Sequence, residues 1–377
     1  MKRYLLPFLE KDLRQHKMVF IGGPRQVGKT TLSHLFSQNP AHYLNWDDAE
    51  TRRRILANEL PYKPEYLIFD EIHKYKEWRN FLKGFYDLHN KETKIIVTGS
   101  ARLDYYRRGG DSLMGRYFYY RLSPLSLNEL PTKNPNKKDL LQLLQFGGFP
   151  EPFFSGEESF WRRWSKERRK KVIQEDLIDL ERVKEVSTFS LLADILPDRA
   201  SSLLSIKSLK EDLLVAHETV DRWLEILENL YYIFRLSPYQ QQENKIKLMK
   251  KERKVYMWDW SAVIDIGAKF ENLVASQLLK YCHFIEDTEG FEMNLYFLRD
   301  QEKREIDFIV TKDKKPLFAV ECKSGEKSLS RHIPYFAKRT DIPFFYQVHL
   351  GEKNVFMEEY RARLMPFIDF CRELKMP

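Results

Sequence analysis

The stretch that decides the fold of the N-terminal part is Phe20-Ile-Gly-Gly-Pro-Arg-Gln-Val-Gly-Lys-Thr-Thr-Leu32. It contains the pattern G-x-x-x-x-G-K-[ST], in which glycines let backbone N–H groups face phosphate oxygens and the lysine reaches the β- and γ-phosphates. Apolar residues 18–21 before it predict a buried strand, and residues 30–36 after it predict a helix that presents its positive amino end. The pattern predicts a nucleoside-triphosphate site, with the Thr30 hydroxyl as a Mg²⁺ ligand. The residues expected to line this site are Gly23, Pro24, Arg25, Gln26, Val27, Gly28, Lys29, Thr30 and Thr31.

A second segment with nucleotide chemistry follows at Glu65-Tyr-Leu-Ile-Phe-Asp-Glu-Ile72, an apolar strand that ends in two carboxylates. In phosphate-loop hydrolases the first acid orders the Mg²⁺ shell, and the second orients or deprotonates the attacking water. We therefore predict Asp70 as a Mg²⁺ ligand and Glu71 as the catalytic base. Another strand is predicted at residues 94–100, and its end places Thr98 and Ser100 where a hydroxyl can sense the γ-phosphate. A helix cap is the alternative role for either hydroxyl.

Strands alternate with helices from about residue 18 to 125, which predicts an α/β fold with a doubly wound parallel sheet. Ligands of such sheets bind beyond the carboxyl ends of the strands, where the segments above converge. Asn136-Lys-Lys-Asp139 spells the N-K-x-D pattern that reads guanine in GTPases, but it follows a Pro- and Asn-containing segment instead of a buried strand. We interpret it as a solvated loop and expect the cofactor to be ATP.

Composition limits the class of protein. A chain of 377 residues, with 43% hydrophobic and 31% charged residues, is long and apolar enough for two or three ordinary domains. The excess of 63 Lys and Arg over 55 Asp and Glu gives a net charge of +8, which is compatible with a polyanionic partner. The three cysteines form no C-x-x-C pair and predict neither a zinc site nor a disulfide framework. No apolar stretch approaches the roughly 18 residues of a membrane span, so we expect no membrane partner and a cytoplasmic location.

The ordered set of N-terminal motifs resembles a prokaryotic family of AAA-type ATPases, whose members carry a C-terminal domain of unknown function. The segments that carry the resemblance are the phosphate loop, Phe69-Asp-Glu71, Thr98-Gly-Ser100, Leu113-Met-Gly-Arg116 and Leu122-Ser-Pro-Leu-Ser126, with Gly147-Gly-Phe-Pro-Glu151 similar to the junction between the parts. The resemblance implies that Arg116 contacts the γ-phosphate, either in its own subunit or from a neighbour in a homo-oligomer. A structural arginine beside a strand is the alternative.

Residues 131–190 read as a helical connector between an ATPase domain at 1–130 and the segments that follow. Within it, residues 158–171 combine two tryptophans with many Arg and Lys residues. Such a helix can track a phosphate backbone. A solvated helix with its tryptophans in a core is the favoured interpretation.

Residues 191–255 show the pattern of a winged helix. An S-x-x-E capping box at Ser208 predicts a short helix, a second helix is predicted over residues 219–230, and apolar strands at 231–234 and 254–257 flank a polar loop. The second helix exposes Asp221, Glu225 and Glu228, which repel phosphates, whereas the loop is basic. We therefore expect any DNA contact to be made by the basic wing, at Lys245, Lys247, Lys250, Lys251, Arg253 and Lys254.

The C-terminal segment, residues 256–377, carries a candidate metal site. Residues 305–310 and 317–323 predict two strands joined by a hairpin, so that Asp307 and Glu321 approach each other and Lys323 shares a face with Glu321. Two acids with an E-x-K spacing resemble the PD-(D/E)xK restriction-endonuclease-like fold. That resemblance implies that Asp307, Glu321 and the helical Glu271 hold Mg²⁺, while Lys323 assists phosphodiester cleavage.

The leading hypothesis is an α/β multidomain ATPase that binds DNA and cleaves it with Mg²⁺. The alternative is a signalling or scaffold ATPase whose C-terminal domains bind protein or nucleic acid without cleavage. The acidic second helix favours the alternative, and the set of Glu271, Asp307, Glu321 and Lys323 favours the nuclease.

Overall fold

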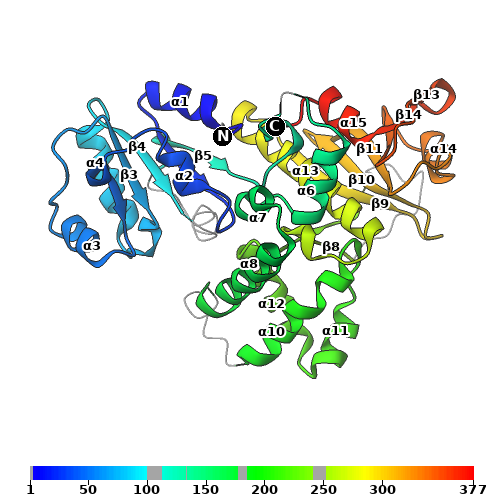
Figure 1. The fold of residues 1–377 in the computed structure, drawn as a ribbon, viewed down its shortest axis with the longest axis horizontal. Coiled ribbons are helices and arrows are strands. Elements are labelled where there is room, and N and C mark those ends of the chain that lie inside the picture. Colours follow the sequence, from blue (N-terminus) through cyan, green and yellow to red (C-terminus); the bar gives the residue numbers. More distant parts are fainter. Residues whose placement is uncertain (1–2, 100–112, 133, 177–184, 241–251) are drawn as a thin grey trace. The chain divides into compact units, whose positions relative to one another are not determined.

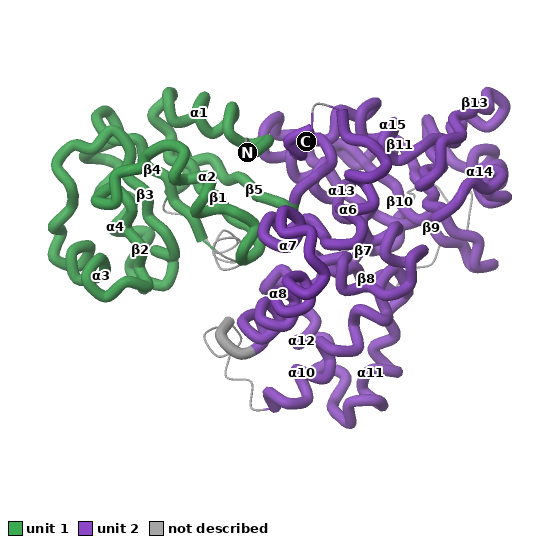
Figure 2. Tube along the Cα trace, in the orientation of Figure 1, with its two compact units in different colours: residues 1–124 green, residues 125–377 purple. Residues whose placement is uncertain are grey.

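The fold is described from a computed structural model, which describes residues 3–99, 113–132, 134–176, 185–240 and 252–377 (Figure 1). The chain divides into two compact units, Met1–Pro124 and Leu125–Pro377 (Figure 2). The predicted ATPase segment corresponds closely to unit 1. The three segments predicted after it all lie within unit 2. Ser100 and the lysines at 245, 247, 250 and 251 lie outside the described residues.

Unit 1 contains the predicted parallel sheet. All neighbouring strands run in the same direction, and their order is β2-β3-β4-β1-β5. Strands β1, β3 and β4 match the apolar segments that predicted them, because each is a short run of buried residues between polar ones. The strands are β1 (Met18–Gly22), β2 (Tyr43–Asn45), β3 (Tyr66–Asp70), β4 (Lys94–Thr98) and β5 (Tyr117–Arg121).

Helices cover both faces of this sheet. On one face Phe20 and Phe69 pack with Trp78 and Phe85 of α4 (Trp78–His89). On the other face α1 (Leu6–Arg14) packs against β1 and β4, and α2 (Lys29–Ser33) packs against β4. Helix α3 (Ala49–Leu56) packs beside β2. Helix α2 ends at Ser33 and is therefore shorter than the predicted 30–36.

Unit 2 is built on a six-stranded mixed sheet with the order β13-β14-β12-β11-β10-β9. Its predicted hairpin is present, since β10 and β11 pair antiparallel with Phe308 opposite Val320. The long helix α13 (Ile266–Glu289) packs against β9, β10 and β11. The strands are β9 (Met293–Arg299), β10 (Glu305–Lys312), β11 (Lys315–Lys323), β12 (Phe345–His349), β13 (Val355–Met357) and β14 (Ala362–Pro366), with helices α14 (His332–Ala337) and α15 (Phe367–Glu373).

The remainder of unit 2 is mainly helical, with a small antiparallel sheet of order β6-β8-β7. Trp164 of α8 is buried, as the core interpretation of that basic helix predicted, whereas Trp161 is only partly buried. The helices are α6 (Lys137–Phe146), α7 (Pro150–Ser155), α8 (Glu158–Lys170), α10 (Val186–Ile195), α11 (Ile206–Leu213) and α12 (His217–Asn229), and the strands are β6 (Ser202–Leu203), β7 (Ile233–Leu236) and β8 (Lys254–Met257).

Two local predictions in unit 2 are wrong. Helix α11 begins before Ser208, because the Ser205 hydroxyl accepts the Ser208 N–H and so caps the helix three residues earlier than predicted. The predicted loop over residues 136–139 is instead the start of α6, and Asn136 is the capping residue just before it. It caps α6 through the N–H groups of Lys138 and Asp139, and the Asp139 carboxylate accepts the Asn136 N–H in return. The N-K-x-D pattern is thus a capping box.

In the part of the chain that the structure describes, no helix is long and apolar enough to cross a membrane.

Candidate functional site

The phosphate loop between β1 and α2 has the backbone that its sequence predicts. Gly23 and Gly28 have φ values of 145° and 98°. A Cβ atom on Gly23 would lie 2.3 Å from the Leu122 carbonyl oxygen, so only glycine allows this close approach. The buried Lys29 ammonium donates to the carbonyls of Gly23 (2.9 Å) and Pro24 (2.7 Å), which places its charge over the loop.

Asp70 is the centre of a hydroxyl network at the carboxyl end of β3. Thr98 of β4 donates to its Oδ1 at 2.5 Å, and Thr30 of α2 donates to its Oδ2 at 3.4 Å. Tyr43 of β2 also donates to Oδ2, a partner that the sequence did not predict. Burial and the neighbouring Asp70 charge raise the pKa of the Tyr43 hydroxyl, so this group stays a neutral donor. Thr98 thus binds the acid in this structure, which explains its place at the strand end.

Glu71 adopts an unusual backbone conformation directly after β3. Its φ is 55°, in the left-handed region that non-glycine residues rarely occupy, and its N–H donates to the Thr98 carbonyl at 2.9 Å. The carboxylate Oε2 lies 3.3 Å from Nε2 of the buried His73. Backbone strain of this kind is concentrated at functional sites. The turn holds Glu71 beside Asp70, where a residue that acts on water is required.

The residues of this edge fit ATP with Mg²⁺. The Thr30 hydroxyl and the Asp70 carboxylate, 3.4 Å apart, are oxygen ligands of the type that Mg²⁺ prefers. The glycine-lined loop and the Lys29 ammonium supply the groups that neutralise phosphate charge. Loop, Mg²⁺ ligands and Glu71 all lie at the carboxyl edge of the parallel sheet, as expected for this fold.

Arg116 lies at the opposite end of the same sheet, where the parallel strands begin. It precedes β5, its carbonyl accepts the Met18 N–H, and β5 runs parallel to β1. Five strand residues therefore separate it from the phosphate loop, a distance of about 16 Å. Its guanidinium forms a two-pronged ion pair with Asp87 of α4, at 2.8 and 3.1 Å. A contact with the γ-phosphate of its own subunit does not fit this placement. Action on a neighbouring subunit remains a proposal.

We expect Arg116→Ala to leave ATP turnover unchanged in a dilute, monomeric sample, because the side chain is far from its own phosphate loop. Phosphate release measured over a dilution series tests this. If wild-type turnover per subunit rises with concentration and the variant's does not, Arg116 acts on a neighbour, and mixing Arg116→Ala with Lys29→Ala should then restore activity. If Arg116→Ala loses turnover at every dilution, Arg116 acts on the ATP of its own subunit, and its placement far from the phosphate loop is wrong.

The predicted acids of unit 2 come together at one end of the β10–β11 hairpin. Asp307 of β10 is fixed across the hairpin, because its Oδ2 accepts the Cys322 N–H at 2.8 Å. Glu321 of β11 accepts a hydrogen bond from Lys323 at 2.6 Å. Glu271 of α13 accepts the Tyr256 hydroxyl at 2.9 Å. We refer to Glu271, Glu305, Asp307 and Glu321 as the acid cluster.

Lys254 and Glu305 belong to this site, although the sequence did not predict them there. The Lys254 ammonium lies 3.1 Å from Glu271 Oε1, 2.5 Å from Glu305 Oε1 and 3.6 Å from Asp307 Oδ1. Its side chain is only 3% exposed, so the prediction that it belongs to a DNA-contacting wing is wrong. The reason is strand geometry, since Lys254 and Tyr256 share one face of β8 and both point to Glu271.

Burial and mutual repulsion change the acidity of the cluster. Burial together with the Asp307 charge raises the pKa of Glu271 to about 8 and that of Glu321 to about 7. Burial opposes charge on Lys254, but the surrounding Tyr256, Glu271, Asp307 and Glu305 hold its pKa well above the usual value. For Glu305, Lys254 and Arg299 outweigh burial and lower the pKa. Lys254 is therefore a permanent cation.

The cluster as arranged does not fit a divalent metal ion. Among the residues that the structure describes, no group of three or more His, Cys, Asp or Glu side chains is placed to hold one. Instead, three carboxylates converge on the Lys254 ammonium. One carboxylate oxygen, Oε2 of Glu321, is buried without a hydrogen-bond partner in the described structure. Mg²⁺ requires several oxygen ligands, and in this arrangement Lys254 already holds one oxygen each of Glu271, Glu305 and Asp307.

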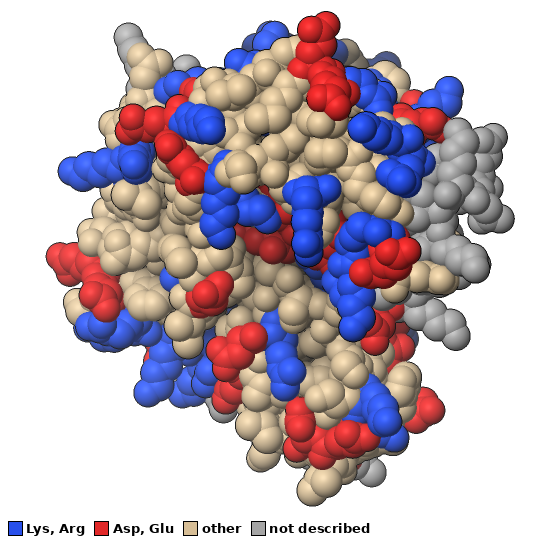
Figure 3. Space-filling model, turned by 90° about the vertical axis from the view of Figure 1, so that its right-hand side faces the viewer, with Lys and Arg blue, Asp and Glu red and all other residues tan. Residues whose placement is uncertain are grey.

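Basic side chains border acidic ones on one face of the molecule. Figure 3 shows Asp and Glu side chains recessed in a hollow, with Lys and Arg side chains around it. Within the acid cluster's own surroundings, the side chains of Lys323 and Arg299 are 29% and 21% exposed, whereas that of Glu321 is 5% exposed. These two cations therefore reach solvent while the acids lie deeper.

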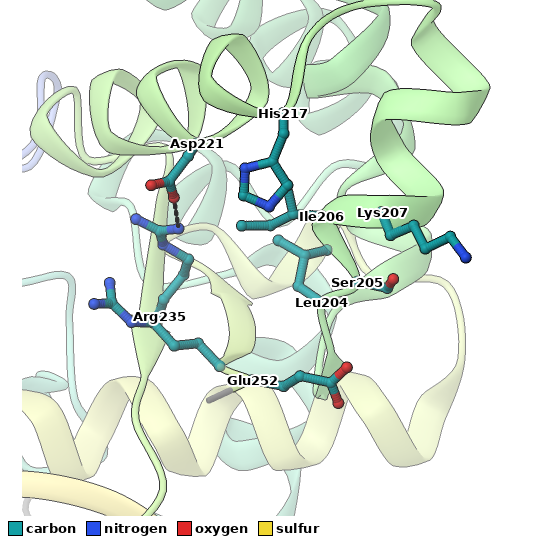
Figure 4. Close-up of a pocket in the computed structure, with 9 residues that line it drawn as sticks. Leu204, Ser205, Ile206, Lys207, His217, Asp221, Arg235 and Glu252 are labelled. Carbon is teal, nitrogen blue, oxygen red and sulfur yellow. Dashed lines mark hydrogen bonds and ion pairs between the residues drawn. The ribbon is translucent and has the colours of Figure 1, made fainter. Parts of the chain in front are cut away.

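A separate polar cavity of about 390 Å³ lies between the starts of α11 and α12 and the strands β7 and β8 (Figure 4). Arg235 of β7 is paired with Asp221 and Glu228 of α12, at 3.4 and 2.7 Å. Two of the three acids that were expected to repel phosphates thus share one arginine as their partner. Arg235 is therefore paired within the protein and adds no free positive charge to the cavity. It is lined by Leu204, Ser205, Ile206, Lys207, His217, Asp221, Arg235, Glu252 and Arg253.

Comparison with known families divides the chain into three matched segments. Residues 15–131 match a family described as an AAA domain. Residues 137–266 and 266–368 match two families described as domains of unknown function, DUF8612 and DUF4143. The first match supports the interpretation of unit 1 as an ATPase domain. The other two descriptions name no activity, so they confirm neither the winged-helix nor the endonuclease-like prediction.

Relatives align over most of the chain. An uncharacterized protein of Methanocaldococcus jannaschii is 26% identical over 365 residues, covering 88% of this chain and 80% of the relative. An uncharacterized protein of Mycobacterium tuberculosis is 23% identical over 343 residues, covering 86% and 74%. These alignments span both units, so the combination of the two units recurs in both relatives.

Solved structures resemble this chain only weakly. AMPPCP-bound DnaA from Aquifex aeolicus has a TM-score of 0.31 and 13% identity, covering 59% of this chain and 86% of that one. PCH-2 of C. elegans has a TM-score of 0.22 and 12% identity, covering 59% and 66%. Both TM-scores are too low to support a functional comparison.

Proposed function

We propose that this protein binds and hydrolyses ATP in unit 1 and uses the nucleotide cycle to control how unit 2 binds nucleic acid. The observation that carries the first half is the edge where Lys29 covers the phosphate loop and Thr30 and Asp70 stand beside the strained Glu71. The match of residues 15–131 to an AAA domain supports it.

Each residue of this edge has a role that follows from its chemistry. Lys29 and the loop N–H groups neutralise phosphate charge and fix the orientation of the nucleotide. Thr30 and Asp70 would hold Mg²⁺, which supplies positive charge to the β- and γ-phosphates. Tyr43 and Thr98 donate to Asp70 and so fix its rotamer. Glu71 orients the attacking water and accepts its proton.

The nucleic-acid half rests on unit 2. The partly exposed Lys323 and Arg299, and the wider border of Lys and Arg in Figure 3, carry positive charge of the kind that a phosphate backbone attracts. In its finer form the proposal includes Mg²⁺-dependent cleavage of DNA, as the E-x-K resemblance implies. Cleavage of this kind requires Mg²⁺ to displace Lys254 from the acid cluster.

The test uses the full-length protein with linear, circular and single-stranded DNA, with Mg²⁺ or Mn²⁺ and with or without ATP. We expect binding, measured by fluorescence anisotropy, to weaken as salt rises, because counterions compete for the phosphates. Lys323→Ala should weaken it, whereas Lys314→Ala, which removes an exposed lysine at the hairpin turn, should not. If the protein shows no salt-sensitive binding to any of these DNAs, the proposal that unit 2 binds nucleic acid is wrong. If it binds DNA but cuts none, only the proposal of cleavage is wrong.

A second candidate is an ATPase whose unit 2 binds a partner without cleaving anything. The specific observation in its favour is that three of the four acids already bind an internal cation, Lys254. Under this alternative, no DNA is cut with either metal ion, and Asp307→Ala changes the stability of unit 2 but no catalytic rate.

A further inference from the structure

Three carboxylates of unit 2 surround one buried ammonium. Lys254 Nζ contacts Glu271, Glu305 and Asp307, which come from α13 and β10, while Lys254 itself begins β8. We propose that Lys254 is the resident cation of the acid cluster, so that the cluster forms without a divalent metal ion and accepts one only when this ammonium is displaced.

Each of the three carboxylates around Lys254 also has a second hydrogen-bond partner. Glu271 Oε1 also accepts the Tyr256 hydroxyl, the other Asp307 oxygen accepts the Cys322 N–H, and the other Glu305 oxygen accepts Arg299 at 2.5 Å. These partners hold the three carboxylates in place around Lys254. Buried charges are tolerated only when they are paired and hydrogen-bonded in this way.

The second lysine of the site is placed differently. Lys323 bonds only Glu321 among the four acids and is 29% exposed, whereas Lys254 bonds the other three and is 3% exposed. Removal of Lys323 therefore leaves one acid without its cation, whereas removal of Lys254 leaves three. This contrast assigns the role of resident cation to Lys254 and makes Lys323 its matched control.

Metal binding must compete with Lys254 for the same oxygens. A divalent ion needs several oxygen ligands at close range, and Lys254 holds one oxygen each from Glu271, Glu305 and Asp307. Two cations at one cluster repel each other, so the ion and the ammonium exclude one another. When Lys254 is replaced with a neutral side chain, the stability of the cluster should come to depend on a bound divalent metal ion.

The experiment is a thermal unfolding series on the full-length protein without nucleotide, titrated with MnCl₂. We expect the unfolding temperature of the wild type to be insensitive to Mn²⁺. Lys254→Met should unfold at a lower temperature in EDTA and be restabilised by Mn²⁺, by roughly 5–15 °C at concentrations 100 to 1,000 times the dissociation constant. Lys323→Met should show no stabilisation by Mn²⁺, because Lys254 still occupies the cluster. Adding Asp307→Asn to Lys254→Met should remove the response to Mn²⁺.

A direct measurement covers the case in which Lys254→Met does not fold. Free Mn²⁺ in the presence of wild-type protein, measured by electron paramagnetic resonance, should show no tight site that depends on Asp307. Submillimolar Mn²⁺ binding in the wild type that Asp307→Asn abolishes would overturn the proposal, as would a Lys254→Met protein that is as stable in EDTA as the wild type. The proposed function is tested separately by DNA binding and ATP turnover, so it can fail while this inference stands.

Discussion

Glu71→Gln is expected to bind ATP normally and to hydrolyse it about 10²- to 10⁴-fold more slowly than the wild type, the usual loss when a general base is removed. Glutamine keeps the size of the side chain, but it cannot accept the proton of the attacking water. The turn after β3 should be unaffected, because its hydrogen bond to Thr98 is made by the backbone N–H of residue 71. Phosphate release at saturating ATP measures turnover, and calorimetric titration measures affinity.

Glu59→Gln is the matched control for this variant, since it removes an exposed carboxylate from the same unit. Its turnover should equal that of the wild type. Near-normal turnover of Glu71→Gln would show that Glu71 is not the base and that its strained backbone serves another purpose.

Lys29→Ala should lower the affinity for ATP by about 10- to 150-fold, the equivalent of the roughly 1.5–3 kcal/mol of a hydrogen bond to a charged group. The physical reason is that Lys29 acts on the bound phosphates before any reaction, so its loss weakens binding, whereas loss of Glu71 slows turnover. Titration with a non-hydrolysable ATP analogue measures the effect. Lys11→Ala, at an exposed position of α1, is the control. Equal affinities of Lys29→Ala and wild type would exclude the loop as the phosphate site.

The nucleotide site could be predicted from the sequence because its main groups lie in two short local patterns. The phosphate loop requires glycine at fixed positions for backbone reasons, and Asp70 and Glu71 follow a buried strand whose end is fixed by the sheet. The contact of Tyr43 with Asp70 could not be predicted, because it depends on the pairing of β2 with β3. The role of Arg116 at the γ-phosphate was predicted only from the family resemblance. The parallel register of β5 with β1 places Arg116 at the end of the sheet away from the phosphate loop.

The acid cluster could be predicted only in part, because its members come from elements far apart in the sequence. Its hairpin and the position of Asp307 followed from strand alternation, but Lys254 follows a run of basic residues and was grouped with them. The signal that separates it is the period of two, since Lys254 and Tyr256 share one face of β8 as Glu305 and Asp307 share one face of β10. Which charged faces meet depends on how β8, β10 and α13 pack, and no local pattern contains that information.

The measurement that tests the central claim most directly is the release of phosphate from ATP with Mg²⁺ by the purified full-length protein, compared with Lys29→Ala prepared in the same way. We predict steady turnover by the wild type that the variant lacks at equal ATP concentration, with the same melting temperature for both proteins. Phosphate release that is the same in both proteins, with or without DNA, would contradict the assignment of unit 1 as an ATP-hydrolysing domain.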